Sequence, residues 1–173
     1  IKLDSGEEIK KPGIVHRLDK ETSGVILVAK NQATFLFLKN QFQERETRKT
    51  YLAIVYGHVK NDMGIIDAPI ARSSTDFRRW SASRGKRGKE REAVTEYKVL
   101  KRLQINSDGK LINPDIGVDR GKIRGISSFT VLEVKPKTGR THQIRVHMKF
   151  LNHPVVCDKL YAPNMPCPVL GMD

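Results

Sequence analysis

The densest group of polar residues in the sequence runs from His16 to Gly24 and reads HRLDKETSG. It stands directly before an apolar run, and loops carried by a rigid scaffold are where catalytic groups tend to lie. Asp19 is therefore a candidate catalytic carboxylate. A structural role is the alternative, because Asp19 or Thr22 can also turn the chain into the strand that follows.

One class of enzyme can be excluded from this loop. The catalytic loop of a protein kinase reads His-Arg-Asp and supplies a later Asn as a metal ligand. Here a leucine separates Arg17 from Asp19, no suitable Asn follows, and no Gly-rich phosphate loop precedes. The sequence therefore does not predict a kinase.

A second polar group, GRTHQIRVH, covers residues 139–147 at the start of a predicted helix. Backbone N–H groups at a helix start, together with Arg140 and Arg145, form a natural site for a phosphate or a carboxylate. Arg145 follows the apolar Ile144, so its guanidinium can reach inward along the core, where a buried arginine needs a carboxylate partner. The alternative is a solvated arginine on the flank of the helix.

His142 and His147 in this group raise the question of a metal site. Their separation of five residues differs from the i, i+4 spacing of a two-histidine zinc site, and no carboxylate accompanies them. The sequence therefore predicts no bound metal.

The stretch from Arg78 to Arg91 is strongly basic, with seven basic residues against one acidic residue. Gly85 and Gly88 make it pliable, so we predict a basic loop over residues 72–91. Runs of lysine and arginine are often only a solvated face, but this charge is unbalanced rather than interspersed, which favours contact with phosphate. The candidates for that contact are Arg78, Arg79, Lys86 and Arg87.

The whole chain carries a formal net charge of +13 at pH 7. A surface this basic attracts polyanions, and nucleic acid is the leading partner. No apolar run approaches the ~20 residues that a spanning helix needs, and no signal peptide is evident, so we expect a soluble, cytoplasmic protein. The two cysteines, Cys157 and Cys167, suggest neither a disulfide framework nor a zinc ligand set, which favours a reducing compartment.

Hydrophobic periodicity predicts the elements that must position these groups. A length of 173 residues suits a single domain. The predicted elements are a buried strand over 24–30, a helix over 32–46 capped by Asn31, strands over 48–57, 64–70, 92–103 and 128–134, an insertion-like segment over 104–126, and a helix from Thr141 onward. Short links between the strands favour an α+β fold with a mixed, largely antiparallel sheet and flanking helices.

Four segments together resemble the RluA family of RNA pseudouridine synthases in order, spacing and content. They are HRLDKETSGVILVAK (16–30), RKTYLAIVYG (48–57), GRTHQIRVHM (139–148) and HPVVCDKLYA (153–162). The resemblance runs over nearly the whole chain and is weakest in the basic loop and in residues 104–126. It implies the pseudouridine synthase fold, with an active site in a basic cleft.

The resemblance also implies roles for individual residues. Asp19 falls on the family's catalytic aspartate, and Arg17 falls on an arginine that holds the place of the flipped nucleotide. Tyr51 falls on a tyrosine expected to stack on the uracil and able to act as a base, and Arg145 falls on an arginine expected to pair with the aspartate. The substrate is then structured RNA, ribosomal RNA first and tRNA second, bound by a monomer that needs no cofactor. The RNA-binding candidates outside the basic loop are Arg17, Arg140 and His142.

The family pattern is not matched everywhere. Only fifteen residues precede His16, and the chain stops soon after Tyr161, so we expect one catalytic domain over 1–173 that lacks the family's usual N-terminal part and C-terminal end. Cys157 and Ala162 stand where glycine is usual.

The alternative to a pseudouridine synthase is an RNA-binding module that works by contact alone. A metal-dependent nuclease or deaminase would need clustered carboxylates or a Cys/His zinc set, and the sequence offers neither.

Overall fold

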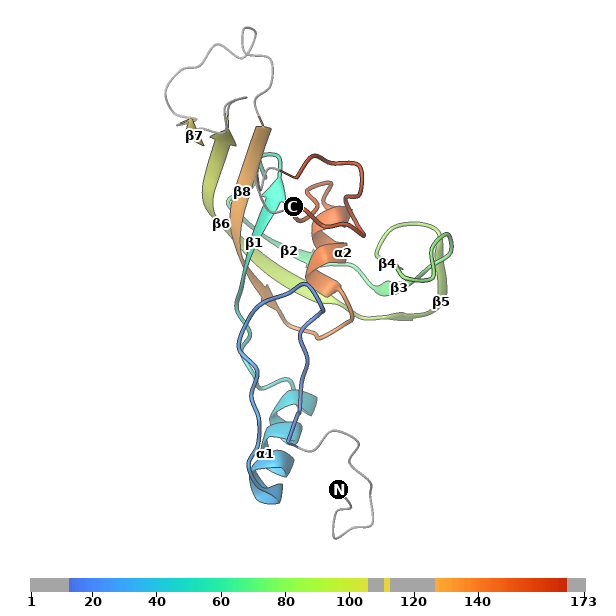
Figure 1. Ribbon diagram of the computed structural model, residues 1–173. Coiled ribbons are helices and arrows are strands. Elements are labelled where there is room, and N and C mark those ends of the chain that lie inside the picture. The colour runs from blue at the N-terminus through green and yellow to red at the C-terminus, as the bar shows by residue number, and fades with distance from the viewer. Residues whose placement is uncertain (1–12, 106–110, 113–126, 168–173) are drawn as a thin grey trace, which may run out of the picture. The chain divides into compact units, whose positions relative to one another are not determined.

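The computed structural model describes residues 13–105, 111–112 and 127–167. The chain divides into two compact units, residues 1–48 and 49–173. Their positions relative to each other are not determined, so each unit is described by itself (Figure 1). The HRLD segment belongs to the first unit, and the other three segments of the family pattern lie almost entirely in the second.

The first unit contains the helix α1, Gln32–Gln43. Asn31 caps its start, because the side-chain oxygen accepts the backbone N–H of Thr34 at 2.8 Å. Phe35 is buried, as the periodicity predicts. The predicted helix and its cap are confirmed, although the helix ends at Gln43 rather than at residue 46.

The predicted buried strand over residues 24–30 is wrong. Its backbone forms one isolated bridge, between Val28 and Ile14, and Ala29 donates to the Gly13 carbonyl at 2.8 Å. Val25 is 79% exposed. A strand requires a continuous ladder of hydrogen bonds to a neighbour, and the apolar composition on which the prediction rested says nothing about a neighbour.

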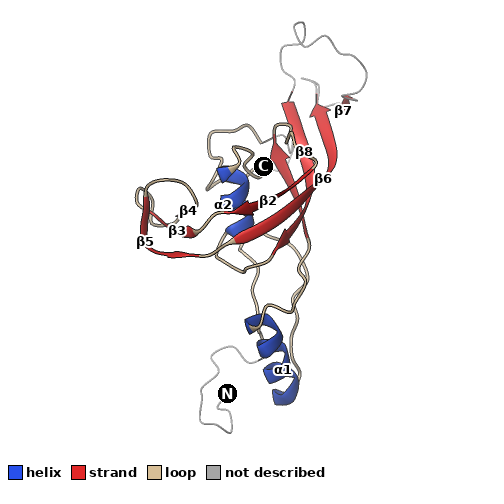
Figure 2. Cartoon of the chain, turned by 180° about the vertical axis from the view of Figure 1, so that it is seen from behind, coloured by secondary structure: helices blue, strands red, loops and turns tan. Residues whose placement is uncertain are grey.

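The second unit is built on an antiparallel sheet (Figures 1 and 2). The spatial order of its strands is β1-β8-β6-β2, with β7 beside β6, and all the described pairings are antiparallel. The strands are β1 (Tyr51–Tyr56), β2 (Met63–Asp67), β6 (Val94–Ile105), β7 (Leu111–Ile112) and β8 (Ser127–Pro136). The α+β class is confirmed.

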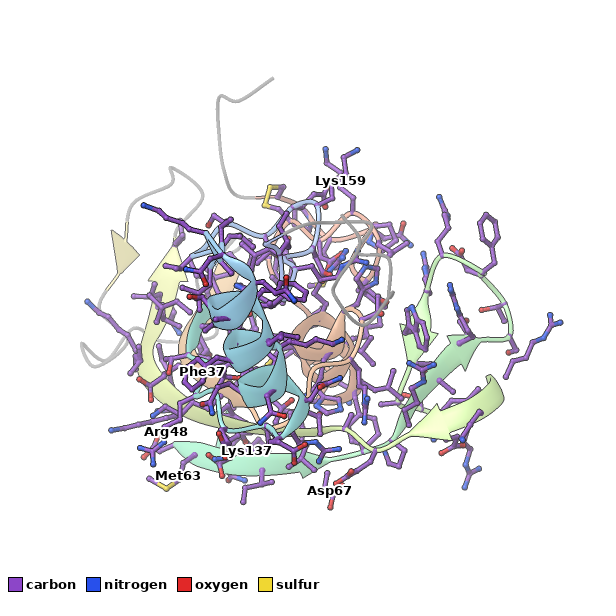
Figure 3. All side chains as sticks on the ribbon, turned by 90° about the horizontal axis from the view of Figure 1, so that it is seen from below. Phe37, Arg48, Met63, Asp67, Lys137 and Lys159 are labelled. Carbon is purple, nitrogen blue, oxygen red and sulfur yellow. A yellow bond between two sulfur atoms is a disulfide. The ribbon has the colours of Figure 1, made fainter. Side chains whose placement is uncertain are left out.

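Alternating burial defines the two faces of this sheet. Ala53 and Val55 of β1 are buried, whereas Leu52, which directly precedes Ala53, is 73% exposed. The helix α2, Gln143–Phe150, covers the buried face, and its Val146 joins the same core cluster. On the opposite side, Met63 and Asp67 of β2 point away from α2 (Figure 3). The face predicted for residues 92–103 is buried at Ala93, Thr95 and Tyr97 and half-buried at Val99.

The predicted basic loop is instead a small three-stranded antiparallel sheet of order β4-β3-β5. Its strands are β3 (Ile70–Ser73), β4 (Trp80–Ser81) and β5 (Lys86–Arg91). The prediction failed because ladder hydrogen bonds join backbone groups, so lysines and arginines can form a strand whose faces lie in solvent. Gly85 permits the turn between β4 and β5 with a φ of +79°. We call residues 70–91 the basic sheet.

Two further predicted segments differ in detail. The strand predicted over residues 64–70 is divided, because β2 ends at Asp67 and β3 begins after Pro69, which has no N–H to donate. Most of the insertion-like segment, residues 106–110 and 113–126, lies outside the described residues. Its first two residues continue β6, and Leu111 pairs with Ile105.

Candidate active site

Arg145, near the start of α2, forms a buried ion pair with Asp158. The Nε of Arg145 donates to Oδ2 of Asp158 and the Nη2 to Oδ1, both at 2.7 Å. The arginine side chain is 17% exposed and the aspartate side chain 3%. Arg145 therefore reaches inward from the helix, and two parallel bonds fix the plane of its guanidinium.

Asp158 is held by its own turn as well as by the arginine. Its Oδ1 also accepts the backbone N–H groups of Leu160 and Tyr161, both at 2.9 Å. Burial acts to raise the pKa of Asp158, but the hydrogen bonds from Arg145 and from these two N–H groups outweigh it and hold the pKa below its usual value. Asp158 is therefore an ionised, fully occupied carboxylate.

Tyr161 connects the ion pair to its surroundings. The ring centroid lies 5.0 Å from Cζ of Arg145, a cation–π distance. The Oη accepts the backbone N–H of Trp80 at 3.0 Å and lies 2.9 Å from Nδ1 of His142. Tyr161 thus links the start of α2 to strand β4 of the basic sheet.

A buried polar network anchors α2 to the main sheet. The Gln143 side chain donates to Thr95 Oγ1 at 2.9 Å and accepts from Thr138 Oγ1 at 2.7 Å. His147 lies 2.8 Å from Thr95 Oγ1 through Nδ1 and 3.0 Å from the Ala68 carbonyl through Nε2. Burial lowers the pKa of His147, so the ring is neutral, with its proton on the nitrogen that faces the carbonyl. His147 is therefore a core residue.

Tyr51 is the first residue of β1. It is half-buried, alternates onto the same face as Ala53 and Val55, and packs against the core cluster that also receives Ile144 of α2. Tyr51 and the helix that carries Arg145 therefore share one face of the main sheet.

Asp19 and Arg17 lie in the first unit. The carbonyl of Asp19 accepts the N–H of Thr22 at 3.0 Å, which closes a turn, and the residue is half-buried, whereas Arg17 is exposed. His16 anchors this loop, because its Nε2 accepts the Leu27 N–H at 2.9 Å and its ring stacks on Phe42 of α1 with centroids 4.8 Å apart. Asp19 and Arg145 belong to different units, so their pairing stays a prediction.

Arg140 and His142, two RNA-binding candidates, stand immediately before α2. Nε of Arg140 donates to the Glu92 carbonyl at 2.9 Å, and its backbone N–H donates to Gln143 Oε1 at 3.0 Å. His142 takes a left-handed conformation with a φ of 56°. The backbone at this helix start is thus tightly constrained.

Part of the charge of the basic sheet is neutralised within it. Arg78 makes a bidentate ion pair with Asp76, in which Nε donates to Oδ1 at 3.1 Å and Nη2 donates to Oδ2 at 2.9 Å. Nε of Arg79 lies 3.3 Å from Oδ2 of the same carboxylate. Hydrogen bonds from the side chain and the backbone N–H of Arg78, together with the charges of Arg78 and Arg79, lower the pKa of Asp76 to about 2. Lys86 pairs with Glu90 at 2.7 Å, and Arg87 is exposed.

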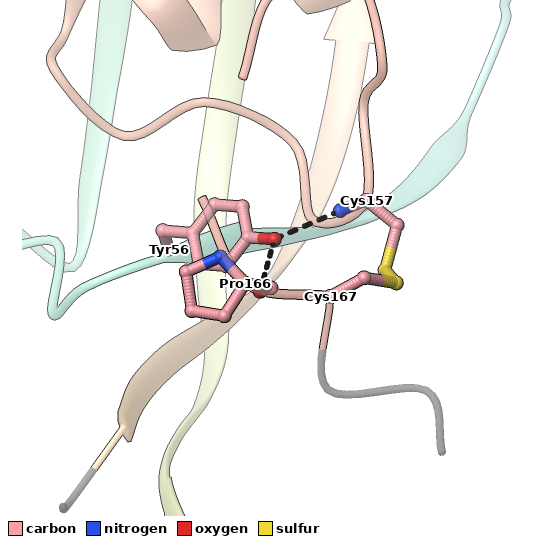
Figure 4. The surroundings of a disulfide bond; sticks show 4 residues. All are labelled: Tyr56, Cys157, Pro166 and Cys167. Carbon is pink, nitrogen blue, oxygen red and sulfur yellow. Dashed lines mark hydrogen bonds between the residues drawn. A yellow bond between two sulfur atoms is a disulfide. The ribbon is translucent and has the colours of Figure 1, made fainter. Parts of the chain in front are cut away.

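The two cysteines were not expected to form a disulfide, and this expectation is wrong, because Cys157 and Cys167 form one with their Cα atoms 4.8 Å apart. Tyr56 brings the two segments together (Figure 4). Its Oη accepts the Cys157 N–H at 3.1 Å and donates to the Pro166 carbonyl at 2.8 Å. The spacing of the two cysteines in the sequence does not show that the chain turns back and brings Cys167 next to Cys157. The expectation of a reducing compartment rested on free thiols and loses that support.

The residue of this site that sequence reasoning missed is Asp158, the partner of Arg145. It lies within the segment HPVVCDKLYA, but no charge pattern distinguishes it from its neighbours. A turn signal was available, because aspartate favours turns closed by its own side chain.

Neither helix that the structure describes has the length and the apolar composition that a membrane-spanning helix requires.

Comparisons with known proteins agree with this architecture. A family model described as RNA pseudouridylate synthase matches residues 1–150. Ribosomal large subunit pseudouridine synthase D of Borreliella burgdorferi is 41% identical over 162 residues, which cover 94% of this chain and 42% of the relative. Dual-specificity RNA pseudouridine synthase RluA of Vibrio vulnificus is 35% identical over 90% of this chain and 54% of the relative. The chain therefore spans about half the length of these relatives.

A solved structure is also similar. Human RNA Pseudouridylate Synthase Domain Containing 1 aligns with a TM-score of 0.67 and 34% sequence identity, over 86% of this chain and 54% of the human chain. The likeness therefore extends to the fold as well as to the sequence.

Proposed function

This chain belongs to the RNA pseudouridylate synthase family, and on that premise we propose that it converts uridine to pseudouridine in structured RNA. The observation that carries the proposal is the family match over residues 1–150, which includes Asp19, Tyr51 and Arg145. Relatives named for the RluA family support the same assignment.

The proposed reaction is an isomerisation of the nucleotide. The bond from C1′ to N1 of uracil breaks, the base turns, and C1′ is joined to C5. The hydrogen on C5 is lost as a proton, and N1 gains one, so no redox partner is required.

Asp19 acts as an anion at the sugar in this proposal, either by attacking C1′ or by assisting proton removal nearby. Arg145 keeps that carboxylate ionised and aimed, since an opposite charge within ~4 to 6 Å lowers the pKa of an acid by roughly 1 to 3 units. Tyr51 packs on the uracil ring and accepts the proton from C5 in the last step.

The target uridine must leave its stack to reach Asp19, which costs a few kcal/mol. Basic groups elsewhere supply the binding energy through phosphate contacts that weaken with salt. In this proposal these groups are Arg17 and Arg140, with His142 beside them, and Arg78, Arg79, Lys86 and Arg87 of the basic sheet. Ribosomal RNA is the first substrate to test, because a relative is named for the large ribosomal subunit, and tRNA is the second. We further propose a cytoplasmic monomer that uses no cofactor.

The test is tritium release from RNA labelled at C5 of uracil, because C5 loses its hydrogen only if the isomerisation occurs. The parent protein and its Asp19→Asn form are compared on ribosomal RNA and on tRNA. We expect release by the parent and none by the variant, with similar RNA binding by both. Binding without release by the parent would contradict the proposal and favour a module that works by contact alone.

A further inference from the structure

We propose that the turn over residues 158–161 is a positioning element for Arg145, in which Asp158 binds the edge of the guanidinium and the ring of Tyr161 packs against it. The inference rests on the proposed function, because it assumes that Arg145 acts in the reaction. Asp158 and Tyr161 are then positioning residues that act through Arg145 and need not touch the RNA.

The contact to the edge is made by Asp158. Its two carboxylate oxygens each lie 2.7 Å from a nitrogen of Arg145, and its side chain is 3% exposed. Water therefore competes little for these bonds. Two parallel bonds between planar groups fix orientation as well as distance. The N–H bonds of Arg145 that are not directed at Asp158 are thereby aimed in a fixed direction.

The carboxylate is a rigid acceptor because its own chain holds it. The backbone N–H groups of Leu160 and Tyr161 both donate to Oδ1 at 2.9 Å. Asp158 cannot rotate away from α2 without breaking these bonds. The arginine is thus fixed to a turn and not to another mobile side chain.

The second contact to the guanidinium is made by the ring of Tyr161. Its buried ring lies 5.0 Å from Cζ of Arg145, and its Oη is bonded to the Trp80 N–H at 3.0 Å and to His142 Nδ1 at 2.9 Å. The ring is therefore held from the basic sheet and from the start of α2 at once. A ring held in this way limits how far the guanidinium can move while it stays bonded to Asp158.

Such fixing has a chemical reason. An arginine side chain has several rotatable bonds and large rotamer entropy, and a displacement of about 1 Å in a catalytic group can lower a rate about 100-fold. An arginine held by Asp158 and by the Tyr161 ring pays this ordering cost on folding and not at the moment of reaction.

The test is a double-mutant cycle on the single-turnover rate of tritium release. Asp158→Asn keeps the shape of the side chain and removes its charge, so we expect the rate to fall up to about 100-fold while RNA affinity changes less than about twofold. A lysine at position 145 cannot form a bidentate ion pair. Adding Asp158→Asn to the Arg145→Lys variant should therefore lower its rate by less than about a further twofold. Equal losses in both backgrounds would show that the turn only supports the fold, and would overturn the proposal.

Asp62→Asn is the matched control. Asp62 accepts from Nη2 of Arg102 at 2.7 Å, in an ion pair at the edge of the main sheet. The same substitution there removes an Asp–Arg pair without touching α2 or the turn. Its single-turnover rate should stay within about twofold of the parent.

A second measurement needs neither activity nor a folded Asp158→Asn protein. In the parent, the Nε–H of Arg145 donates to a buried carboxylate, so its NMR signal should exchange with water more slowly than those of exposed arginines such as Arg87. Its loss in Arg145→Lys assigns the signal. Exchange as fast as that of the exposed arginines would overturn the proposal.

The inference and the proposed function fail in different ways. If the parent releases no tritium from any RNA, the proposed function fails, and the exchange rate of Arg145 Nε–H still decides whether Asp158 holds the guanidinium. If the parent is active and the losses in the cycle are additive, only the positioning role fails.

Discussion

Two carboxylates of this protein, Asp19 and Asp158, are suited to different tasks. Asp158 accepts four hydrogen bonds, two from Arg145 and two from backbone N–H groups. A carboxylate whose oxygens already accept four hydrogen bonds is a weak base and a weak nucleophile. Asp19 lies half-buried in a turn of the first unit, and it is the carboxylate that we expect to react.

His147 and Arg145, two residues apart on α2, show how neighbouring polar residues divide between fold and function. Through Thr95 Oγ1 at 2.8 Å and the Ala68 carbonyl at 3.0 Å, His147 joins the helix to the main sheet. Arg145 faces the turn that contains Asp158. The motif GRTHQIRVH therefore contains residues that hold the helix as well as Arg145, for which we propose a role in the reaction.

The buried state of His147 predicts how stability depends on pH. The unfolded chain binds a proton near the ordinary pKa of 6.5, whereas burial lowers the pKa of His147 in the folded protein. The contribution to stability is therefore fully present above pH 6.5 and is lost as the pH falls below it, by up to about 1.4 kcal/mol per pH unit. Urea unfolding at pH 7.5 and pH 5.5 should show this loss, and His147→Gln should show a smaller one. An equal loss in parent and variant would assign the effect to other groups.

At the scale of elements, the basic sheet combines regular backbone pairing with a positive charge that is partly neutralised within the sheet. Its strands leave arginines and lysines in solvent, while Trp80 ties the sheet to Tyr161 through a 3.0 Å hydrogen bond. Asp76 neutralises part of this positive charge by forming ion pairs with Arg78 and Arg79. If the basic sheet binds RNA as we propose, an RNA phosphate must compete with Asp76 for these two guanidinium groups.

This competition predicts that Asp76→Asn strengthens RNA binding. Without the carboxylate, Arg78 and Arg79 are available to phosphate, so affinity at physiological salt should rise several-fold. The slope of log K against log salt should become steeper by roughly 1 to 2 for one or two added phosphate contacts. Filter binding between 50 and 300 mM salt measures both quantities. Arg78→Gln should change the slope in the opposite direction, and an unchanged slope in both variants would remove these arginines from the RNA interface.

At the scale of the whole molecule, the sequence predicts elements whose signals are local. The alternation through Thr95 and Tyr97 predicts β6, and Asn31 predicts the start of α1, because period and capping belong to the segment itself. The strand expected over residues 24–30 failed because it depends on a neighbour. The basic sheet was missed because its pairing uses backbone groups, which side-chain patterns do not report.

The candidate site divides in the same way. Arg145 and Tyr51 stand in motifs with a recognisable order of residues, so they could be proposed from the sequence. The ion pair with Asp158 and the disulfide between Cys157 and Cys167 could not, because each depends on two segments meeting in the fold. Side-chain spacing predicts contacts within one element and gives no distance between different ones.

The net charge of +13 predicts the kinetics of encounter with RNA. A field of this size attracts a polyanion from beyond contact distance, and salt screens it with a Debye length that falls from about 10 Å at 0.1 M to about 3 Å at 1 M. Stopped-flow association with fluorescent ribosomal RNA should therefore slow at least about tenfold between 50 and 300 mM salt. Asp19→Asn should show the same dependence, because it changes the reacting group and hardly changes the total charge. A salt-independent association rate would mean that this charge does not guide encounter, and the basic groups would then act only after the complex has formed.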